Sequence, residues 1–281
     1  MQYVEIKCYV QPLEAGSEVL VALLADIGCE SFMEFEEGVM AYVPKKDFKK
    51  ELLEMLPIPE DAGFTYRYEI SEIEDQNWNA VWESNYAPVL IENQCYIRAP
   101  FHETRKDVAY DILIEPKMSF GTAHHETTAL MISYLLQEDC KGKEVLDMGC
   151  GTGVLAILAS MRQAKHIIAI DTDEWAFENC CENAQRNCIA NMDCLLGDVN
   201  RIPHTAFDII LANINRNVLL QDMATYAARL KAGGVLFLSG FYETEDLPII
   251  KNEAARQGLS YVSHKTKNKW TAVKFKSFIM S

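Results

Sequence analysis

The sequence predicts an α/β protein in which a small α+β domain precedes a larger domain built on a parallel sheet. Its 281 residues, 49% apolar and 24% charged, suffice for one large and one small domain at roughly 150 residues per domain. Strand and helix patterns alternate regularly after Lys143, which is typical of parallel strands joined by helices on both faces. Before residue 73 the patterns instead follow the order βαββαβ of a ferredoxin-like fold.

The elements of the first domain, residues 1–73, follow from short periodic segments. Residues 3–10 alternate apolar and polar side chains, as a half-buried strand does. Glycine at position 28 supplies a helix end, and Pro57 stops another helix. The other expected elements are a helix over 17–28, a hairpin of residues 32–35 and 39–43 around Glu36-Glu37-Gly38, a helix over 46–56 and a strand over 64–70.

Residues 74–94 are expected to be a linker with its docking contacts. The segment is polar apart from Trp78 and Trp82, which are four apart and would share one helical face. We expect the two tryptophans to make a core or interdomain contact rather than a substrate contact. Two strands, at 95–98 and 109–114, then lead into the large domain.

The large domain, residues 95–281, shows the clearest alternation. The buried run at 144–148 is typical of a central parallel strand, and the following residues 154–162 have the length and spacing of a helix. The chain should finish with an antiparallel hairpin around Lys267-Asn268-Lys269. Further strands are expected at 166–170, 193–196, 207–212 and 235–239, and further helices at 174–188, 218–230 and 245–257.

Composition narrows the classes of function. The net charge of −15 disfavours a nucleic-acid substrate and favours a basic protein partner, and the first 73 residues carry 15 acidic against 6 basic side chains. The nine cysteines lack paired CxxC spacing, so we expect reduced thiols and no metal. With no apolar run long enough for a membrane helix and no signal core, a cytoplasmic protein is expected.

A glycine turn marks the expected ligand site. The strand Val145-Leu146-Asp147-Met148 runs into Gly149-Cys150-Gly151-Thr152-Gly153 and then a helix, so backbone can approach a ligand and the helix N-terminus can face negative charge. Val154 stands where a nicotinamide-binding GxGxxG motif needs its last glycine. The spacing fits the G-x-G-x-G of S-adenosylmethionine enzymes, with Asp147 ordering the turn.

Two more carboxylates follow the next strands. Asp171 ends the strand 166–170, where it can accept hydrogen bonds from both ribose hydroxyls, although a helix-capping role is the alternative. Asp198 follows Gly197 after the third strand and can meet the adenine amino group, or serve as a cap residue. Together with Gly149 and Gly151, these residues form the expected cofactor site.

With these residues in place, the chain resembles the PrmA methyltransferases of large-subunit ribosomal protein eleven over nearly its whole length. The resemblance is carried by the segment from Met118 to Thr128, by the glycine turn and by Ala212-Asn213-Ile214-Asn215. It implies a class I methyltransferase domain, S-adenosyl-L-methionine as cofactor, and ribosomal protein eleven, free or in the ribosome, as partner.

The resemblance also implies individual roles. The element around His124-His125-Glu126 closes over the cofactor in that family, and the matching cofactor contacts here are Thr128, Gly149, Asp171 and Asn213. Ala123 replaces a glycine of the family pattern, which we expect to remove access to positive φ. Asn215 and Arg216 replace a leucine and an alanine.

Methyl transfer to an amine needs positioning more than covalent help. Asn213, after the strand 207–212, can accept a hydrogen bond from the amine and orient its lone pair; the alternative is a bond to its own loop. His125 is the second catalytic candidate, either contacting the amine or capping the next helix. His124 and His125 are adjacent, which does not make a two-ligand metal face.

The sequence therefore predicts a monomeric, cytoplasmic enzyme that methylates amino groups of a basic ribosomal protein, lysine side chains and possibly an N-terminal amine, with residues 1–73 recognising that protein. No membrane contact or nucleic-acid specificity is expected. The alternatives are an N-methyltransferase of RNA or a small metabolite, which shares the same core, and a non-catalytic cofactor-binding regulator. A dehydrogenase is more remote because of the missing glycine.

Overall fold

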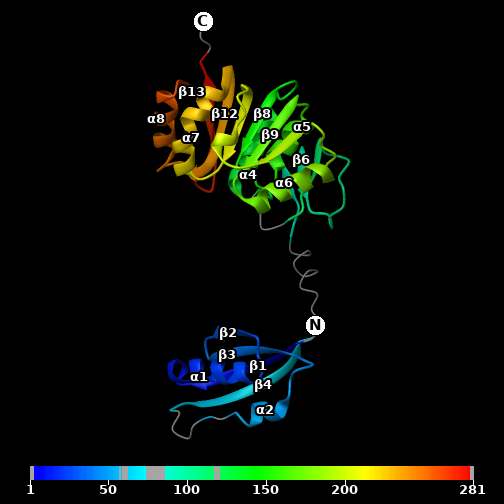
Figure 1. Ribbon diagram of the computed structural model, residues 1–281, viewed down its shortest axis with the longest axis vertical. Helices are drawn as coiled ribbons and strands as arrows, with labels where there is room; N and C mark the ends of the chain where they lie inside the picture. The colour runs from blue at the N-terminus through cyan, green and yellow to red at the C-terminus, as the bar shows by residue number, and fades with distance from the viewer. Residues whose placement is uncertain (1–2, 57, 59–62, 74–85, 117–120, 279–281) are drawn as a thin grey trace. The chain divides into compact units, whose positions relative to one another are not determined.

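The computed structural model describes residues 3–56, 58, 63–73, 86–116 and 121–278 of the chain (Figure 1). The chain divides into two compact units, Met1–Tyr86 and Ala87–Ser281. Each unit has its own hydrophobic core among the described residues. The expected docking tryptophans, Trp78 and Trp82, lie outside the described residues.

The first unit has the expected order βαββαβ. Its four strands form an antiparallel sheet in the order β2-β3-β1-β4. The alternation predicted for the first strand is present: Val4, Ile6, Cys8 and Val10 are buried while their neighbours are partly exposed, which places the two helices over one face. The elements are β1 (Tyr3–Gln11), α1 (Leu13–Asp26), β2 (Ser31–Phe35), β3 (Gly38–Pro44), α2 (Lys50–Glu54) and β4 (Thr65–Ile73).

Two helix boundaries in this unit differ from the expectation. Helix α1 begins directly after Pro12, one turn earlier than residue 17, and still ends before Gly28, whose φ is +98°. Helix α2 covers only Lys50–Glu54, because residues 45–47 form a turn in which the amides of Asp47 and Phe48 donate to the carbonyl of Pro44.

The second unit contains a seven-stranded sheet in the order β10-β9-β8-β11-β12-β14-β13. The first five strands in this order, β10, β9, β8, β11 and β12, pair in parallel. Strand β14 pairs antiparallel with both β12 and β13, so the predicted terminal hairpin is confirmed. The strands are β8 (Glu144–Met148), β9 (His166–Asp171), β10 (Met192–Leu196), β11 (Phe207–Asn213), β12 (Leu230–Tyr242), β13 (Leu259–Lys267) and β14 (Trp270–Ser277).

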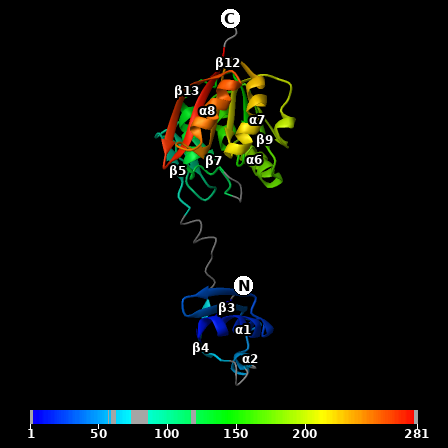
Figure 2. The same cartoon turned by 90° about the vertical axis from the view of Figure 1, so that its left-hand side faces the viewer.

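Helices cover both faces of this sheet, as the alternation predicted. Val145 of β8 belongs to a core shared with helices of the first group, whereas its neighbour Leu146 belongs to the opposite core. The first group is α4 (Glu126–Gln137), α5 (Val154–Met161) and α6 (Glu174–Arg186). The second group is α7 (Arg216–Arg229) and α8 (Leu247–Arg256), which lie side by side in Figure 2.

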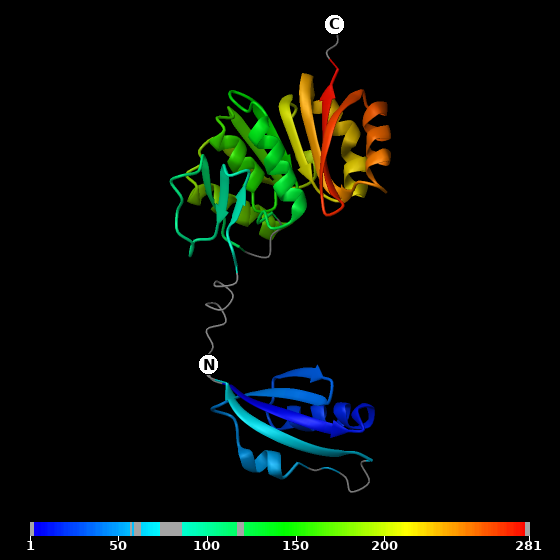
Figure 3. The same ribbon diagram turned by 180° about the vertical axis from the view of Figure 1, so that it is seen from behind.

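A third, three-stranded sheet precedes the large one and was only partly predicted. Strands β5 (Val89–Ile91), β6 (Cys95–Arg98) and β7 (Tyr110–Leu113) pair in that order (Figure 3). Strand β5 falls inside the expected linker 74–94, so the end of that linker is a strand of the second unit. Its three residues are too few to show a periodic pattern.

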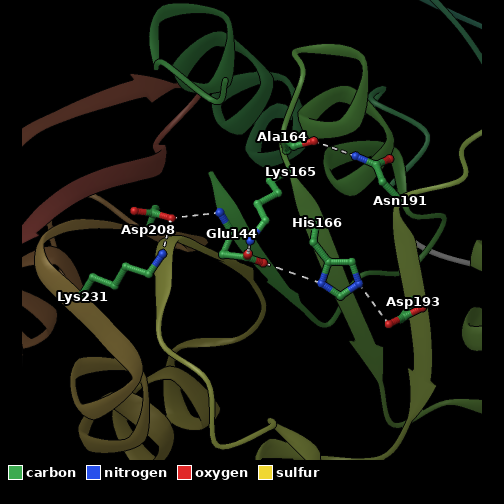
Figure 4. A network of polar contacts seen from close by, with 8 residues as sticks. All are labelled: Glu144, Ala164, Lys165, His166, Asn191, Asp193, Asp208 and Lys231. Atoms are coloured by element: carbon green, nitrogen blue, oxygen red, sulfur yellow. Dashed lines mark hydrogen bonds and ion pairs between the residues drawn. The ribbon is translucent and has the colours of Figure 1, made fainter. Parts of the chain in front are cut away.

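Side chains at the amino ends of the parallel strands form a polar network (Figure 4). His166 of β9 lies between two carboxylates, with Nε2 3.0 Å from Asp193 and Nδ1 3.7 Å from Glu144. Asp208 of β11 accepts from the Lys231 amine at 2.7 Å and from the Glu144 amide at 2.9 Å. Strands β8 to β12 are thus fastened together at the edge where their chains enter the sheet.

All nine cysteines are free thiols, and Cys188, after α6, is the exposed one among them. Among the described helices, none combines the length and the apolar character needed to span a membrane.

Candidate functional site

A cavity of about 540 Å³ opens where the parallel strands end. Parallel strands present their carboxyl ends at one edge of a sheet, where the loops leave room for a ligand. The cavity is lined by the ends of β8, β9, β10 and β11, by the starts of α4, α6 and α7, and by Gly240 of β12 and Trp270 of β14. Its lining includes His125, Gly149, Gly151, Asp171, Asp198 and Asn213, six of the seven residues expected in the site.

The glycine turn after β8 needs its glycines for two reasons. Gly149, Gly151 and Gly153 all have positive φ, at 67°, 54° and 78°, a region that side chains strain. A Cβ on Gly149 would lie 2.2 Å from a methyl of Ile214, and one on Gly153 would lie 2.7 Å from the Cys180 sulfur. The turn is therefore pressed between the β11 loop and helix α6.

Asp171 holds the glycine turn to the next strand. Its Oδ2 accepts from the Gly151 amide at 2.8 Å and its Oδ1 accepts from the Asp173 amide at 3.0 Å. Asp173, and not Asp171, caps α6 by accepting from the Ala176 amide. Asp171 lines the cavity, which is the place a ribose-binding carboxylate requires.

Asp147 lies beneath the turn and is 1% exposed. Its Oδ2 accepts from the Ala156 amide at 3.2 Å, and within the described part of the chain its Oδ1 has no hydrogen-bond partner. Burial raises the pKa of this carboxyl to about 7, with a further upward contribution from Asp171, against the Ala156 bond. The expected role of Asp147 in ordering the turn is consistent with its bond to helix α5.

Asp198 lines the cavity but is exposed, and it caps the short 3-10 helix Val199–Arg201. Both of its oxygens accept from Asn200, one from the amide at 3.0 Å and one from the side chain at 3.1 Å. The capping alternative for Asp198 is therefore present in the structure.

The side chain of Asn213, the last residue of β11, is held on one side only. Its Nδ2 donates to the Thr128 hydroxyl at 3.3 Å, while its Oδ1 is buried and has no hydrogen-bond partner among the described residues. Thr128 is 1% exposed and is not among the residues that line the cavity. The structure thus places Thr128 behind Asn213, where it supports that amide.

His125 caps α4, one of the two roles expected for it. Its Nδ1 accepts from the Thr127 amide at 3.3 Å and lies 2.8 Å from the Thr127 hydroxyl. The same ring lines the cavity and packs edge-on against Trp270, at 4.8 Å between ring centroids. Trp270 in turn packs against Tyr242 at 4.3 Å, and we call these three rings the aromatic wall, of which His125 and Trp270 line the cavity.

The segment before α4 lies against the glycine turn. The carbonyl of Gly121 accepts from the Thr152 hydroxyl at 2.7 Å, and Thr152 is fully buried. Ala123 has φ of +66° and is 2% exposed. The expectation that alanine at position 123 removes access to positive φ is therefore wrong, because burial of the residue holds the strained conformation that its Cβ disfavours.

Asn215 and Arg216, which depart from the resembled pattern, both have structural partners. Asn215 caps α7 by accepting from the Val218 amide at 3.2 Å. Arg216 donates to Asp246 at 2.6 Å, and the other oxygen of Asp246 accepts from the Tyr242 amide at 2.9 Å. Through Asp246, the departure links the start of α7 to Tyr242 of the aromatic wall.

Sequence reasoning missed several cavity residues. Trp270 and Asp222 come from the terminal hairpin and the middle of a helix, where no local motif marks them. Outside the cavity, Asn187, which follows α6, bonds both backbone groups of Leu113 at the end of β7, and Asn183 of α6 accepts from the Glu115 amide. Among the described residues, no three His, Cys, Asp or Glu side chains are grouped as metal ligands.

Comparison with known proteins gives the same family over most of the chain. Residues 18–277 match the family described as Ribosomal protein L11 methyltransferase (PrmA). A protein of that name from Phocaeicola vulgatus is 46% identical, covering 98% of this chain and 99% of the relative. One from Porphyromonas gingivalis is 47% identical over 94% of this chain and 91% of the relative.

Solved structures support the fold. A ribosomal protein L11 methylase from Lactobacillus delbrueckii subsp. bulgaricus superimposes with a TM-score of 0.63 at 24% identity, covering 69% of this chain and all of that chain. A methyltransferase from Pyrococcus furiosus gives 0.51 at 19% identity, covering 60% and 90%. At these identities the two structures show that the second unit has the Rossmann-like methyltransferase fold.

Proposed function

This chain belongs to the ribosomal protein L11 methyltransferase (PrmA) family, and from that premise we propose that it transfers methyl groups from S-adenosyl-L-methionine to amino groups of ribosomal protein L11. The targets are lysine side chains and, second, an N-terminal amine. The single observation that carries the proposal beyond family membership is the buried amide oxygen of Asn213 at the wall of the cavity, to which no described residue donates a hydrogen bond.

The residues of the cavity fit the proposed cofactor. Three glycines with positive φ leave the backbone of the turn bare, so a ligand can approach it closely. Asp171 faces the cavity at the end of β9, where it can accept from ribose hydroxyls, and Val199, Ile214 and Val218 offer apolar surface to a base. When bound, the cofactor supplies an electrophilic methyl group on a positively charged sulfur.

The chain's own contribution is to place the amine. Asn213 is held from behind by Thr128, so its Oδ1 can accept a hydrogen bond from an incoming N–H and direct the nitrogen lone pair. This bond also satisfies a polar atom that is otherwise buried without a partner. His125 lines the same cavity as part of the aromatic wall with Trp270.

The amine must lose its proton before it reacts. A lysine amine has an ordinary pKa of about 10.4, so roughly one in a thousand is uncharged at pH 7. The apolar and aromatic part of the lining, which includes Trp270 and Ile214, disfavours the charged form by desolvation. Asn213 accepts from either form but carries no negative charge that would stabilise the ammonium.

The first unit is proposed to recognise L11. Residues 1–73 carry 15 acidic and 6 basic side chains, and this negative charge suits a basic partner. The enzyme is proposed to act as a cytoplasmic monomer on L11, free or in the ribosome, without nucleic-acid specificity. Asn215 and Arg216 depart from the family pattern on the side of the cavity near the aromatic wall. We propose that they affect the substrate and leave the choice of cofactor unchanged.

The test is transfer of labelled methyl groups from S-adenosylmethionine into unmethylated L11 and into ribosomal RNA, offered separately to the pure protein. Label in L11 alone, at lysines located by mass spectrometry, is the expected result. Label in RNA alone would contradict L11 as the substrate and make ribosomal RNA the substrate instead. Absence of label from both, with cofactor still bound, would leave the metabolite and regulatory alternatives standing against the proposal.

A further inference from the structure

Asp222 of α7 is a buried carboxylate in the cavity wall, and the proposed reaction gives it no role. It is 7% exposed, and it lies one helical turn after Val218, which also lines the cavity. The two side chains therefore share one face of α7, with Val218 at the exposed rim and Asp222 deeper. A buried carboxylate at such a place needs donors to offset its lost hydration.

The chain itself supplies few of those donors. Among the described residues, the Tyr226 hydroxyl is the one side-chain group that donates to Asp222, at 3.3 Å. No ion pair within the described part of the chain includes Asp222. Burial raises the pKa of Asp222, and the neighbouring Asp198 raises it further, against the Tyr226 bond. A neutral N–H donor from a ligand would complete the site.

Asp198, the other carboxylate on this side of the cavity, is less suited to that task. It is exposed, and both of its oxygens already accept from Asn200 within the 3-10 turn. Asp222 has more accepting capacity left, and Val199 and Val218 provide apolar surface next to it. A flat aromatic ring with an exocyclic amine at its edge matches this combination of surfaces.

We propose that Asp222 accepts a hydrogen bond from the exocyclic amine of the cofactor's adenine and thereby selects an adenosine cofactor over its 6-oxo analogue. The inference rests on the proposed cofactor and assigns a specificity residue to it. A 6-oxo base presents a carbonyl oxygen where the amine stood, so that oxygen would face the Asp222 carboxylate without a proton between them. Two acceptors facing each other in a buried site leave both unsatisfied.

The experiment compares equilibrium binding of S-adenosylhomocysteine and S-inosylhomocysteine to the full chain by calorimetry. Wild-type protein should bind the adenosine compound roughly 100-fold more tightly, in the range that unpaired buried polar groups give. In Asp222→Asn, the new amide can donate to the 6-oxo group while its oxygen still accepts from Tyr226. The ratio should then fall below about 10-fold.

A matched control is Asp173→Asn, which makes the same change at another cavity residue and keeps an oxygen to cap α6. It is expected to leave the ratio of the two affinities as in wild type, even where both affinities change. Should Asp222→Asn fail to fold, Asp222→Ser removes the carboxylate without adding volume, and the same fall in the ratio is expected.

The outcomes separate this inference from the proposed function. Wild-type protein that binds neither compound overturns the cofactor, and the inference with it. Wild-type protein that binds both equally, or an Asp222→Asn protein that keeps the wild-type ratio, overturns the role of Asp222 and leaves the proposed methyl transfer intact.

Discussion

The amide of Asn213 has different surroundings at its two ends, and this asymmetry defines the first prediction at the residue scale. Removing the side chain in Asn213→Ala takes away the acceptor for the amine, and kcat for methylation of L11 should fall by about 100-fold or more. The Kd for S-adenosylhomocysteine, measured by calorimetry, should change by less than about 10-fold.

The supporting residue offers a graded control. Thr128→Val keeps the shape of the buried side chain but removes the hydroxyl that holds Asn213. We expect a smaller loss of kcat, on the order of 10-fold, because the amide remains but is less firmly oriented. An Asn213→Ala enzyme with unchanged kcat would show that Asn213 only forms hydrogen bonds within its own loop and does not position the amine.

Asp147 gives the second prediction, which concerns pH. The unfolded carboxyl ionises near its ordinary pKa of about 3.9, whereas the folded one holds its proton up to a pKa of about 7. The folded state therefore binds more protons between these values, and stability falls as pH rises from about 4 to about 7. Asp147→Asn should remove this fall.

The measurement is the free energy of unfolding by denaturant at pH 5 and pH 8 for both proteins. The wild-type value should drop relative to that of Asp147→Asn by on the order of 2 to 4 kcal/mol between the two pH values. A difference between the proteins that is the same at both pH values would mean that Asp147 is not a titrating buried acid.

At the scale of elements, the glycine turn and helix α6 constrain each other. Gly153→Ala should destabilise the protein by about 2 to 4 kcal/mol, because it combines strain at φ of +78° with a contact of 2.7 Å to Cys180. Gly142→Ala is the matched control, since φ is +69° there but no atom of the described residues lies within 4 Å of a new Cβ. Its cost should be about 1 kcal/mol.

A double variant separates the two causes. In Cys180→Ala, the sulfur that meets the new methyl is gone, so adding Gly153→Ala should cost about as much as Gly142→Ala does, as read from chemical denaturation curves. Equal costs of Gly153→Ala in the presence and absence of the sulfur would contradict the contact.

Elements with strong patterns were the predictable ones. The buried runs of β8, β9 and β11 and the terminal hairpin were located from sequence because each carries several apolar residues in a fixed spacing. Strand β5 was not, because three residues show no period and its stability comes from pairing with β6. The shortening of α2 depends on a turn at Pro44 that composition does not reveal.

The site was predictable to the extent that chemistry follows strand ends. Gly149, Asp171 and Asn213 each end or follow a parallel strand, and all three line the cavity. Thr128 stays a predicted cofactor contact: the adjacent Thr127 lines the cavity, while Thr128 lies behind Asn213, and a sequence pattern does not show which of two adjacent threonines faces a cavity. Trp270 and Asp222 depend on tertiary packing between distant segments.

On the scale of the whole molecule, the two units have separate cores, so they should be separable in function. A chain that begins at Ala87 retains both cores of the second unit. It should bind S-adenosylhomocysteine with a Kd within about 3-fold of the full chain, while kcat/KM for L11 drops by at least about 100-fold, because the recognition surface is gone.

The two assays are calorimetry and transfer of labelled methyl groups. Loss of cofactor binding together with L11 methylation would refute the division of tasks, provided that circular dichroism shows the shortened chain to be folded. Full retention of L11 methylation would instead place recognition in the second unit.

The uneven exposure of the cysteines has a practical consequence. Cys188 is exposed, whereas the other eight thiols are buried or half-buried and have raised pKa values, to about 12 for Cys8, Cys95 and Cys181. Because the thiolate is the reacting form, a maleimide dye at pH 7 should attach at Cys188 first and in one copy per chain. The native sequence thus offers a single fluorescent reporter, and peptide mapping of the labelled protein would establish it without replacing any other cysteine.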